Sequence, residues 1–366
     1  MTHRTRVLVC VWFAVLLVVP AVATLLVRRQ TVDNRELTSF PTIDIDGLLY
    51  GDVPEGVDAY LEDRLSVREL AVEADARVAI DLFDDSPNPN VLLGDDGWLF
   101  TAAAFTMVCE PDWPEVDDVT RQLRRLEANL GQHDASLTTM IVPEKGWAYP
   151  ERLPAAVPDE ECADRRLTEL RDELVTTDHY FDLWSHVQTE VAASPDPLYW
   201  RTDTHWNDPG RVVILPHLIE WLEPGVFDPD AAVVAGVNVT DGGDLAAQVG
   251  VDMPDQSPNY VIQRPRATTR TEPLVPGLVN RHITEGADPV IEGKTLILTD
   301  SHLYNSASLL APWFEDVVIL RWQHQRRVDL DALVDDADQV AISFSGRFSG
   351  PRFERAGRDL TRLLRN

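Results

Sequence analysis

Lysine is almost absent from this chain of 366 residues: Lys145 and Lys294 are the only two, and arginine supplies the other basic side chains. Lysine and arginine together number 32, against 61 aspartates and glutamates, which gives a formal net charge of −29 at pH 7. Binding to nucleic acid or to anionic lipid needs a basic surface. The charge balance therefore argues against both classes of function.

Cysteine is also scarce, with three residues in the chain. Cys10 lies in an apolar N-terminal run, which leaves Cys109 and Cys162 for the remainder. A protein that works outside the cytoplasm often joins such a pair in a disulfide, and we expect this bond here. Two separate buried thiols are the alternative, because the sequence does not tell how close the two Cα atoms lie.

A long run without charge occurs once, at residues 7–27. As a helix it would be about 32 Å long, enough to cross a hydrocarbon core of about 30 Å. We expect a single-pass N-terminal anchor (residues 1–29) with the rest of the chain outside the cytoplasm. The alternative is a cleaved signal peptide, since Ala21-Val22-Ala23 fits a cleavage site. The protein would then be secreted.

The sequence beyond this run predicts two further parts. Residues 30–90 form a juxtamembrane linker followed by a helix that begins near Tyr60, where apolar residues recur at helical spacing. Residues 91–366 form a catalytic domain that opens with a hairpin, in which two apolar runs flank an Asp-Gly turn. Within this domain, residues 223–290 are proline-rich and predict an irregular insertion with a possible small β element.

Helical and strand patterns alternate along the catalytic domain. Helices are predicted at 115–133, 160–175, 209–222 and 352–365, and strands at 137–142, 180–184, 295–299, 317–321 and 340–344. Short buried strands that alternate with helices indicate a three-layer α/β/α fold with a mainly parallel sheet. In such sheets the functional residues follow the C-terminal ends of the strands.

The segment R-T-D-T-H-W-N at residues 201–207 carries an Asp and a His two positions apart. In an extended segment, residues at this spacing point to the same side of the backbone. A carboxylate placed in this way holds an imidazole in one tautomer and stabilises its charged form. Asp203 and His205 are therefore candidates for the base of a serine-nucleophile triad. An arbitrary Asp-x-His, however, is usually structural.

Ninety-six residues after His205, the run K-T-L-I-L-T-D-S-H has the pattern of a buried strand that ends at Asp300-Ser301. A serine at a strand-to-helix junction is exposed and lies near backbone N–H groups that stabilise an oxyanion. Ser301 is therefore the candidate nucleophile. Taken alone, the same serine would be interpreted as a helix N-cap.

These motifs, in this order, resemble those of the SGNH hydrolase-like domain of the alginate O-acetyltransferase group, the AlgX/AlgJ type. The matching segments are D-R-L-S-V-R-E (63–69), G-D-D-G-W-L-F (94–100), V-P-E-K-G-W-A-Y-P (142–150), R-T-D-T-H-W-N (201–207), G-G-D-L-A (242–246) and T-D-S-H (299–302). The resemblance covers roughly residues 57–350. It implies a Ser301 nucleophile, a His205 base, an Asp203 that orients it, and acetyl transfer to a secreted polysaccharide.

Other site residues follow less directly. Gly243 and Asn305 are candidates for the oxyanion site, at positions where the resemblance identifies neither residue firmly. Lys145 follows a predicted strand and is a candidate substrate-site residue, with a salt bridge as the alternative. Trp206 is a candidate sugar platform or a core residue. A metal held by Asp203, His205 and His302 is disfavoured because the three lack a recognisable ligand spacing, and the chemistry calls for no cofactor.

Three functions remain open at this point. The first is an O-acetyltransferase that acts on an exported or cell-surface polysaccharide, with acetyl supplied by a membrane-embedded acyltransferase partner. The second is an extracytoplasmic carbohydrate acetylesterase with the same triad. The third is a non-catalytic scaffold in polysaccharide assembly. Whether sugar or water accepts the acetyl group decides between the first two.

Overall fold

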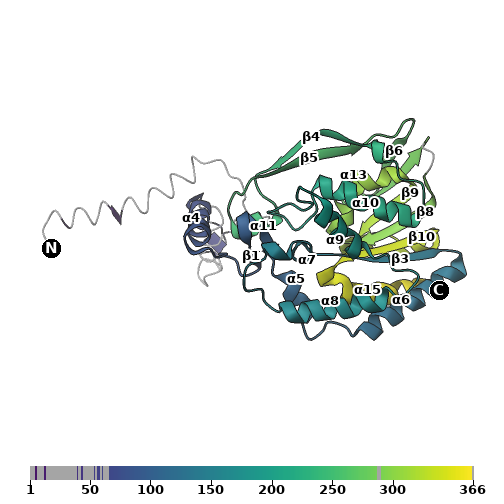
Figure 1. Cartoon of the computed structure of the whole chain (residues 1–366), viewed down its shortest axis with the longest axis horizontal. Coiled ribbons are helices and arrows are strands. Elements are labelled where there is room, and N and C mark those ends of the chain that lie inside the picture. Colours follow the sequence, from purple (N-terminus) through teal and green to yellow (C-terminus); the bar gives the residue numbers. More distant parts are fainter. Residues whose placement is uncertain are drawn as a thin grey trace.

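The computed structural model of this chain describes residues 66–286 and 290–364, together with the single positions 5, 12, 13, 39, 43, 53, 56, 57 and 60 (Figure 1). Among these residues, no helix combines the length and apolar character that crossing a bilayer requires. The anchor expected at residues 7–27 lies outside the described residues except for Trp12 and Phe13. Most of the predicted linker lies outside them as well.

A six-stranded sheet forms the centre of the domain, in the order β3-β10-β8-β9-β7-β6. The strands are β3 (Ser136–Val142), β6 (Thr268–Val275), β7 (Val279–Glu285), β8 (Ile291–Thr299), β9 (Phe314–Arg321) and β10 (Gln339–Ser345). Strands β3, β10, β8 and β9 are parallel, as the sequence predicts. Strand β7 pairs antiparallel with β9, and β6 pairs antiparallel with β7. The sheet is therefore mixed rather than mainly parallel.

This difference arises in the stretch predicted to be irregular. Its residues form the hairpin β6–β7, which extends the main sheet, and the separate two-stranded sheet of β4 (Ala232–Thr240) and β5 (Asp255–Ile262). Gly277, with φ of 73°, lies in the short connection between β6 and β7. A two-stranded hairpin needs only such a short turn and no crossover helix, so it joins the sheet edge antiparallel. Prolines and polar side chains obscure the strand periodicity there.

Helices cover both faces of the sheet (Figure 1). On one face lie α6 (Val116–Leu130), α8 (Glu160–Leu174) and α15 (Gly346–Leu363); on the other lie α9 (Leu183–Ala193) and α10 (Asp208–Leu222). The strands bury both faces because their apolar runs are continuous. In β8, for example, Leu296 and Leu298 pack in one core cluster, whereas Ile297 packs in the other. This alternation confirms the three-layer prediction.

The shorter helices connect these layers. They are α5 (Ala103–Thr106), α7 (Lys145–Ala148), α11 (Asp244–Val249), α12 (Ser301–Tyr304), α13 (Ala307–Leu310) and α14 (Leu330–Asp335). The strand predicted at residues 180–184 is wrong. Tyr180 makes only a single bridge to Thr139, and α9 begins three residues later. The Asp182 carboxylate accepts a hydrogen bond from the backbone N–H of Ser185, so a helix cap ends the extended segment early.

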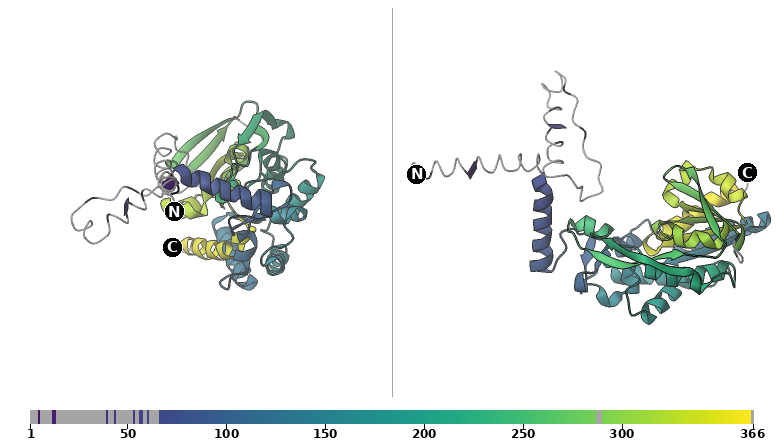
Figure 2. Two further views of the ribbon diagram at one scale, coloured as in Figure 1. Left: turned by 90° about the vertical axis from the view of Figure 1, so that its left-hand side faces the viewer. Right: turned by 90° about the horizontal axis from the view of Figure 1, so that it is seen from above.

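The predicted helix near Tyr60 corresponds to α4 (Ser66–Phe83), which stands at one side of the domain (Figure 2). Ala76 of α4 packs in a small core cluster with the hairpin of β1 (Val91–Leu93) and β2 (Leu99–Thr101) and with α11. This hairpin is the one that the Asp-Gly turn predicts, and Asp96 and Gly97 both have positive φ there. The cluster connects the N-terminal helix to the domain.

Cys109 and Cys162 form a disulfide between a short turn after α5 and the first turn of α8, with Cα atoms 6.1 Å apart. We expect its removal to lower the free energy of unfolding by about 2–4 kcal/mol. The bond closes a long loop and thereby reduces the conformational entropy of the unfolded chain, which destabilises the unfolded state. Urea unfolding of the wild type and of Cys109→Ser/Cys162→Ser, with and without reductant, measures the difference. Cys10→Ser is the matched control and should respond to reductant as the wild type does. Identical unfolding midpoints in the oxidised and reduced wild type would contradict the expectation.

Candidate active site

Ser301 begins α12 directly after strand β8, at the C-terminal edge of the parallel part of the sheet. The residue that caps α12 is Asp300, whose Oδ1 accepts a hydrogen bond from the backbone N–H of His302 at 3.0 Å. Asp300 Oδ2 accepts a second one from the backbone N–H of Ser345, at the end of β10, at 2.7 Å. Because Asp300 has the capping role, the half-buried Ser301 hydroxyl is left to bond elsewhere.

Asp203 and His205 lie at the tip of a narrow loop whose two arms are hydrogen-bonded to each other. The N–H of Asn207 donates to the carbonyl of Leu198 at 3.1 Å, and the N–H of Trp200 donates to the carbonyl of His205 at 3.2 Å. The Asn207 side chain also caps α10 by accepting from Gly210 at 2.9 Å. The loop is thus fixed at its base by the helix that follows it.

The structure brings Asp203, His205 and Ser301 into one hydrogen-bonded chain. His205 Nε2 lies 2.6 Å from the Ser301 hydroxyl oxygen, and His205 Nδ1 lies 2.6 Å from Asp203 Oδ1. The Asp203 carboxylate also accepts hydrogen bonds from the backbone N–H groups of His205 at 2.8 Å and Asp244 at 3.0 Å. This geometry suits removal of the serine proton by an imidazole whose tautomer a carboxylate fixes.

The environment of Asp203 favours its charged form. Burial alone would raise the pKa of this carboxyl group. The hydrogen bond and charge of His205, together with the two backbone N–H donors, outweigh burial and lower the pKa below its usual range. Asp203 is therefore ionised at neutral pH and accepts a hydrogen bond from the Nδ1–H of His205.

Lys145 is buried beneath this loop and binds its backbone. The Nζ atom donates to three carbonyl oxygens: Trp200 at 2.9 Å, Arg201 at 2.8 Å and Asp203 at 2.7 Å. Burial lowers the pKa of Lys145 to about 7, against the opposing charges of Asp203, Asp244 and Asp255. Three acceptors nevertheless require three N–H bonds, which only the ammonium form has. We therefore describe Lys145 as an ammonium that holds the catalytic loop, not as a residue facing the substrate.

Gly243 contacts the triad but does not face Ser301. Its N–H donates to the Thr202 hydroxyl at 3.2 Å, so the oxyanion role expected for it does not fit this geometry. A Cβ at this position would lie 2.2 Å from the Asp203 Cβ and 2.6 Å from the Thr202 carbonyl oxygen. Only glycine permits so close an approach of this segment to the back of Asp203.

Trp206 and Asn305 take different places. Trp206 is 1% exposed and packs edge-on against Tyr199 and His302, so it is a core residue and not a sugar platform. Asn305 is exposed and follows Ser301 by one turn of α12, with its N–H donating to the Ser301 carbonyl at 2.9 Å. Its oxyanion role stays a prediction.

Asp244 is a site residue that the sequence reasoning missed. Its Oδ1 accepts from the Thr204 N–H at 2.8 Å and its Oδ2 accepts from the Thr204 hydroxyl at 2.6 Å. It thereby fixes the residue between Asp203 and His205. An Asp after two glycines, at the start of a helical pattern, was the signal that could have found it.

A second Asp–His pair, Asp300 and His302, lies behind the triad, and the sequence analysis, which considered His302 only as a metal ligand, did not predict this pairing. His302 is buried with its ring centre 5.0 Å from that of His205, and its Nδ1 lies 3.4 Å from Asp300 Oδ1. Burial would lower the pKa of His302, but the hydrogen bond and charge of Asp300 and the charge of Glu144 outweigh it, and the pKa is raised. Glu144 forms an ion pair at 3.1 Å with Arg347 at the start of α15.

Ligand atoms of Asp203, His205 and Asp244 lie within 4.8 Å of one another, a spacing that a metal ion could bridge. The oxygens of both carboxylates already accept hydrogen bonds from the loop itself. His205 Nε2 faces Ser301 and its Nδ1 faces Asp203. These groups are arranged as a hydrogen-bonded triad and its support. His302, considered as a ligand from the sequence, is not in this group.

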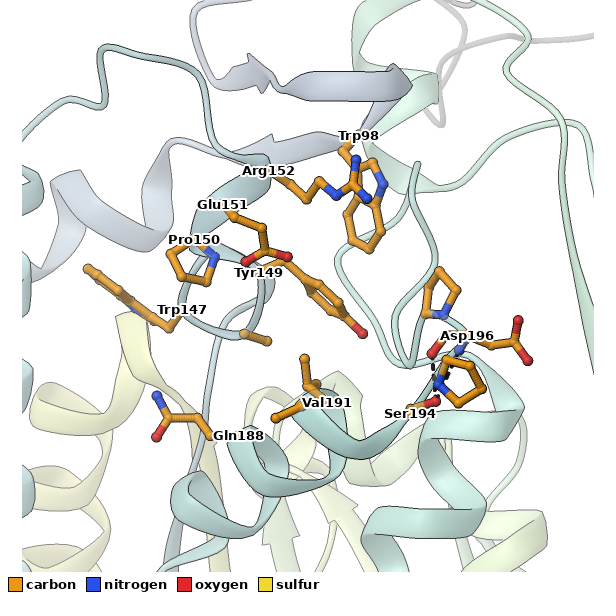
Figure 3. Close-up of a pocket in the computed structure, with 14 residues that line it drawn as sticks. Trp98, Trp147, Tyr149, Pro150, Glu151, Arg152, Gln188, Val191, Ser194 and Asp196 are labelled. Carbon is orange, nitrogen blue, oxygen red and sulfur yellow. Dashed lines mark hydrogen bonds between the residues drawn. The ribbon is translucent and has the colours of Figure 1, made fainter.

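A cavity of about 480 Å³ opens beside the loop, between Trp98, Tyr149 and Arg152 on one side and Val191 and Asp196 on the other (Figure 3). None of the three triad residues lines it. The Tyr149 hydroxyl in its wall accepts a hydrogen bond from the Leu198 N–H at 2.8 Å, at the base of the catalytic loop. A side chain of the cavity wall therefore supports the base of the catalytic loop through this hydrogen bond.

The family model described as "SGNH hydrolase-like domain, acetyltransferase AlgX" matches residues 91–272. This stretch contains Asp203 and His205 and ends before Ser301. Among curated proteins, "Probable alginate O-acetylase AlgJ" of Pseudomonas aeruginosa is 26% identical over 247 residues, and its namesake of Pseudomonas putida is 26% identical over 239. The matches cover 63% and 62% of this chain but only 59% of each relative's length.

Among solved structures, Bacillus cereus PatB1 with a sulfonyl adduct is similar, with a TM-score of 0.52 and 16% sequence identity. The similarity covers 73% of this chain and 99% of that one. At this identity the likeness concerns the fold, which agrees with the mixed α/β sheet described above.

Gly243→Ala is expected to abolish most of the triad's activity, because the new methyl group forces Asp203 or the Gly243 segment to move. The matched control is Gly236→Ala in β4, where a Cβ would meet nothing within 4 Å. Hydrolysis of p-nitrophenyl acetate, together with circular dichroism to check the fold, compares the two variants. A Gly243→Ala protein that is as active as the control would show that Asp203 tolerates displacement.

Asp300 should make the free energy of unfolding depend on pH in the acidic range. Burial would raise its pKa, but the hydrogen bond and charge of His302 and the N–H of Ser345 lower it well below the usual range. The unfolded chain then binds more protons than the fold, so stability is lost as pH falls below about 4. In Asp300→Asn this dependence should be shallower by up to about 1.4 kcal/mol per pH unit. Urea unfolding between pH 2.5 and 6 (a range chosen about the ordinary carboxyl pKa of roughly 4) measures it, and equal slopes would refute the assignment.

Proposed function

We propose that this chain, whose residues 91–272 match the family model of the SGNH hydrolase-like AlgX acetyltransferase domain, transfers acetyl groups to hydroxyls of an exported or cell-surface polysaccharide. The observation that carries the proposal is the unbroken hydrogen-bonded chain from Asp203 through His205 to Ser301, at the C-terminal edge of the sheet. The relatives named as alginate O-acetylases support the reaction class.

In the first half-reaction, His205 Nε2 takes the proton of the Ser301 hydroxyl as its oxygen attacks the carbonyl carbon of an acetyl donor. Asp203 accepts the Nδ1–H hydrogen bond and stabilises the imidazolium that forms. The tetrahedral intermediate then collapses, the bond to the donor's leaving group breaks, and His205 gives its proton to that group. Ser301 now carries the acetyl group as an ester.

In the second half-reaction, His205 takes a proton from a sugar hydroxyl, whose oxygen attacks the acetyl-serine ester. The bond to Ser301 breaks, and His205 returns a proton to the serine oxygen. The N–H of Ser301 at the start of α12 and the side-chain amide of Asn305 are the donors that we assign to the oxyanion. One such donor contributes about 3 kcal/mol of transition-state stabilisation.

The rest of the proposal concerns where this happens. The apolar run at residues 7–27 would anchor or export the chain, which places the triad outside the cytoplasm. Acetyl donors are made inside cells, so a membrane-embedded acyltransferase would have to supply the acetyl group across the bilayer. The disulfide between Cys109 and Cys162 agrees with an oxidising compartment.

Trapping of the acetyl-enzyme tests the proposal. Incubation with p-nitrophenyl acetate followed by peptide mass spectrometry should show one acetyl group on Ser301. Ser301→Ala should lose the adduct and at least about a thousandfold of the hydrolysis rate. The matched control is Ser308→Ala, at an exposed position of α13, which should behave as the wild type. Equal hydrolysis by Ser301→Ala and the wild type would exclude Ser301 as the nucleophile, and a wild type that neither forms the adduct nor hydrolyses the ester would leave a scaffold as the better interpretation.

A second measurement separates transferase from esterase. If sugar is the acceptor, addition of oligosaccharide should speed turnover of the acetyl-enzyme and yield acetylated sugar. If water is the acceptor, acetate should form at a rate that oligosaccharide does not change.

A further inference from the structure

Two arginines near Ser301 lack an acidic partner. Most arginines of this acidic chain are paired in the structure, such as Arg281 with Asp316 and Arg347 with Glu144. Among the described residues, Arg321 and Arg352 have no carboxylate within 4.0 Å. Arg321 Nε is buried and has no hydrogen-bond partner in that part of the chain. Other described arginines pair with a carboxylate, are exposed or, like Arg166 and Arg264, bond to backbone carbonyls, whereas Arg321 and Arg352 are partly buried without either kind of acceptor among the described residues, which needs a physical reason.

Both arginines lie at the sheet edge that carries the nucleophile. Arg321 ends β9 and is the register partner of Thr299, which ends β8 two residues before Ser301. Its guanidinium carbon lies 5.6 Å from the ring centre of Tyr304, on the same short helix as Ser301. Arg352 belongs to α15, which follows β10 on the other side of β8. One side chain therefore comes from the end of β9 and the other from the second turn of the helix after β10, the two strands that flank β8.

Aromatic rings hold both guanidinium groups. The Arg352 guanidinium carbon lies 3.6 Å from the ring centre of Phe348 and 5.5 Å from that of Phe344. Stacking on a ring covers the face of the planar guanidinium but leaves its N–H edge for other partners. Both arginines are only half-exposed, so water satisfies their donors incompletely. The aromatic rings thus fix the orientation of both guanidinium groups, and their N–H donors lack hydrogen-bond acceptors in the part of the chain that the structure describes.

The local charges add to an excess of positive charge. Burial lowers the pKa of Arg352, and the charges of Arg347 and Arg321 act in the same direction, against those of Asp300 and Glu144. Asp300 faces His302 and Glu144 faces Arg347, which leaves Arg321 and Arg352 as the uncompensated pair. Keeping two like charges close together and partly desolvated is unfavourable. Proteins retain such unfavourable arrangements mainly at functional sites.

We propose that Arg321 and Arg352 form an anion-binding subsite beside Ser301, which recognises a carboxylate or phosphate group on the substrate. The subsite rests on the proposed function only in taking Ser301 as the reacting centre. Planar guanidinium edges bind paired anionic oxygens through charge-assisted hydrogen bonds, the interaction that these two side chains lack. The anionic group belongs either to the acetyl donor or to the acceptor glycan, and the two half-reactions separate these sources.

Matched substrates test the subsite. For the donor, phenyl acetate is compared with acetylsalicylate, which adds a carboxylate, and with acetyl phosphate. For the acceptor, a neutral gluco-oligosaccharide is compared with its uronate and its phosphorylated counterparts of equal length. We expect the wild type to favour an anionic member of one of the two sets by about tenfold or more in kcat/KM, and that set identifies the source.

The variant is Arg321→Gln/Arg352→Gln, which keeps polar side chains but removes both charges. The preference for the anionic member should fall to near unity, mainly through a rise in KM, and Arg352→Lys should recover part of it. The matched control is Arg355→Gln on the same helix, whose side chain is 52% exposed and lies 3.8 Å from Asp359. That control should keep the wild-type preference. Thermal unfolding checks that both proteins fold.

Equilibrium binding keeps this test independent of catalysis. Calorimetry with Ser301→Ala protein should show tighter binding of an anionic ligand than of its neutral counterpart, and the difference should disappear when both arginines are also replaced. A wild type without anion preference in either set, or a preference that survives the double replacement, overturns the subsite. If binding selectivity is present but no acetyl-serine forms, the proposed function fails and the subsite stands.

Discussion

The buried ammonium of Lys145 is the interaction on which the site depends. The triad joins a serine at the end of a central strand to a histidine on a loop that has no place in the sheet. Three backbone carbonyls at the tip of that loop accept hydrogen bonds from one Nζ atom, and the carbonyl of Arg201 also accepts one from the N–H of Leu99 in β2. A single buried cation thus holds most of the tip in place. The chain has only two lysines, and one of them is buried for this purpose.

The supports of the triad form successive shells of hydrogen bonds. Asp244 fixes Thr204, the residue between Asp203 and His205, and its own N–H holds the Asp203 carboxylate. Gly243 permits this approach because it has no side chain to separate the two segments. On the serine side, Asp300 caps α12 and ties β8 to β10 through Ser345. Each segment that carries a triad residue is therefore positioned by a carboxylate or an ammonium outside the triad.

Charge is distributed unevenly around this edge of the sheet. The protein as a whole is strongly acidic, yet Arg321 at the end of β9 and Arg352 in the helix after β10 belong to the elements on either side of the strand that leads to Ser301. Glu144 faces Arg347 and Asp300 faces His302, whereas two guanidinium groups face aromatic rings. An acidic surface with a cationic edge at the nucleophile guides an anionic group to one place and repels it elsewhere.

Patterns that depend on neighbouring residues were the predictable part of this protein. The parallel strands β3, β8, β9 and β10 follow from short apolar runs, and helices such as α6 follow from apolar spacing. For residues 223–290 the sequence predicted an irregular insertion with a possible small β element, but not that the hairpin β6–β7 extends the main sheet, since its strands are half-buried at the sheet edge and Pro273 interrupts β6. The strand predicted near Tyr180 was wrong because the helix cap at Asp182 competes with strand formation. Local composition does not reveal whether the cap or the strand prevails.

The sequence by itself determined which residues we propose to carry the chemistry: Asp203 and His205 share an Asp-x-His spacing, Ser301 follows a buried strand, and the two motifs taken together predicted a triad. The tertiary structure alone decided what surrounds them. Lys145 became a support of the loop, Trp206 a core residue and Gly243 a point of close approach, because each role is fixed by segments far away in the chain. Spacing along the backbone determines which side chains share a face of a helix or strand. Contacts between segments that are distant in the chain depend on how the layers pack, and no local sequence pattern encodes this packing.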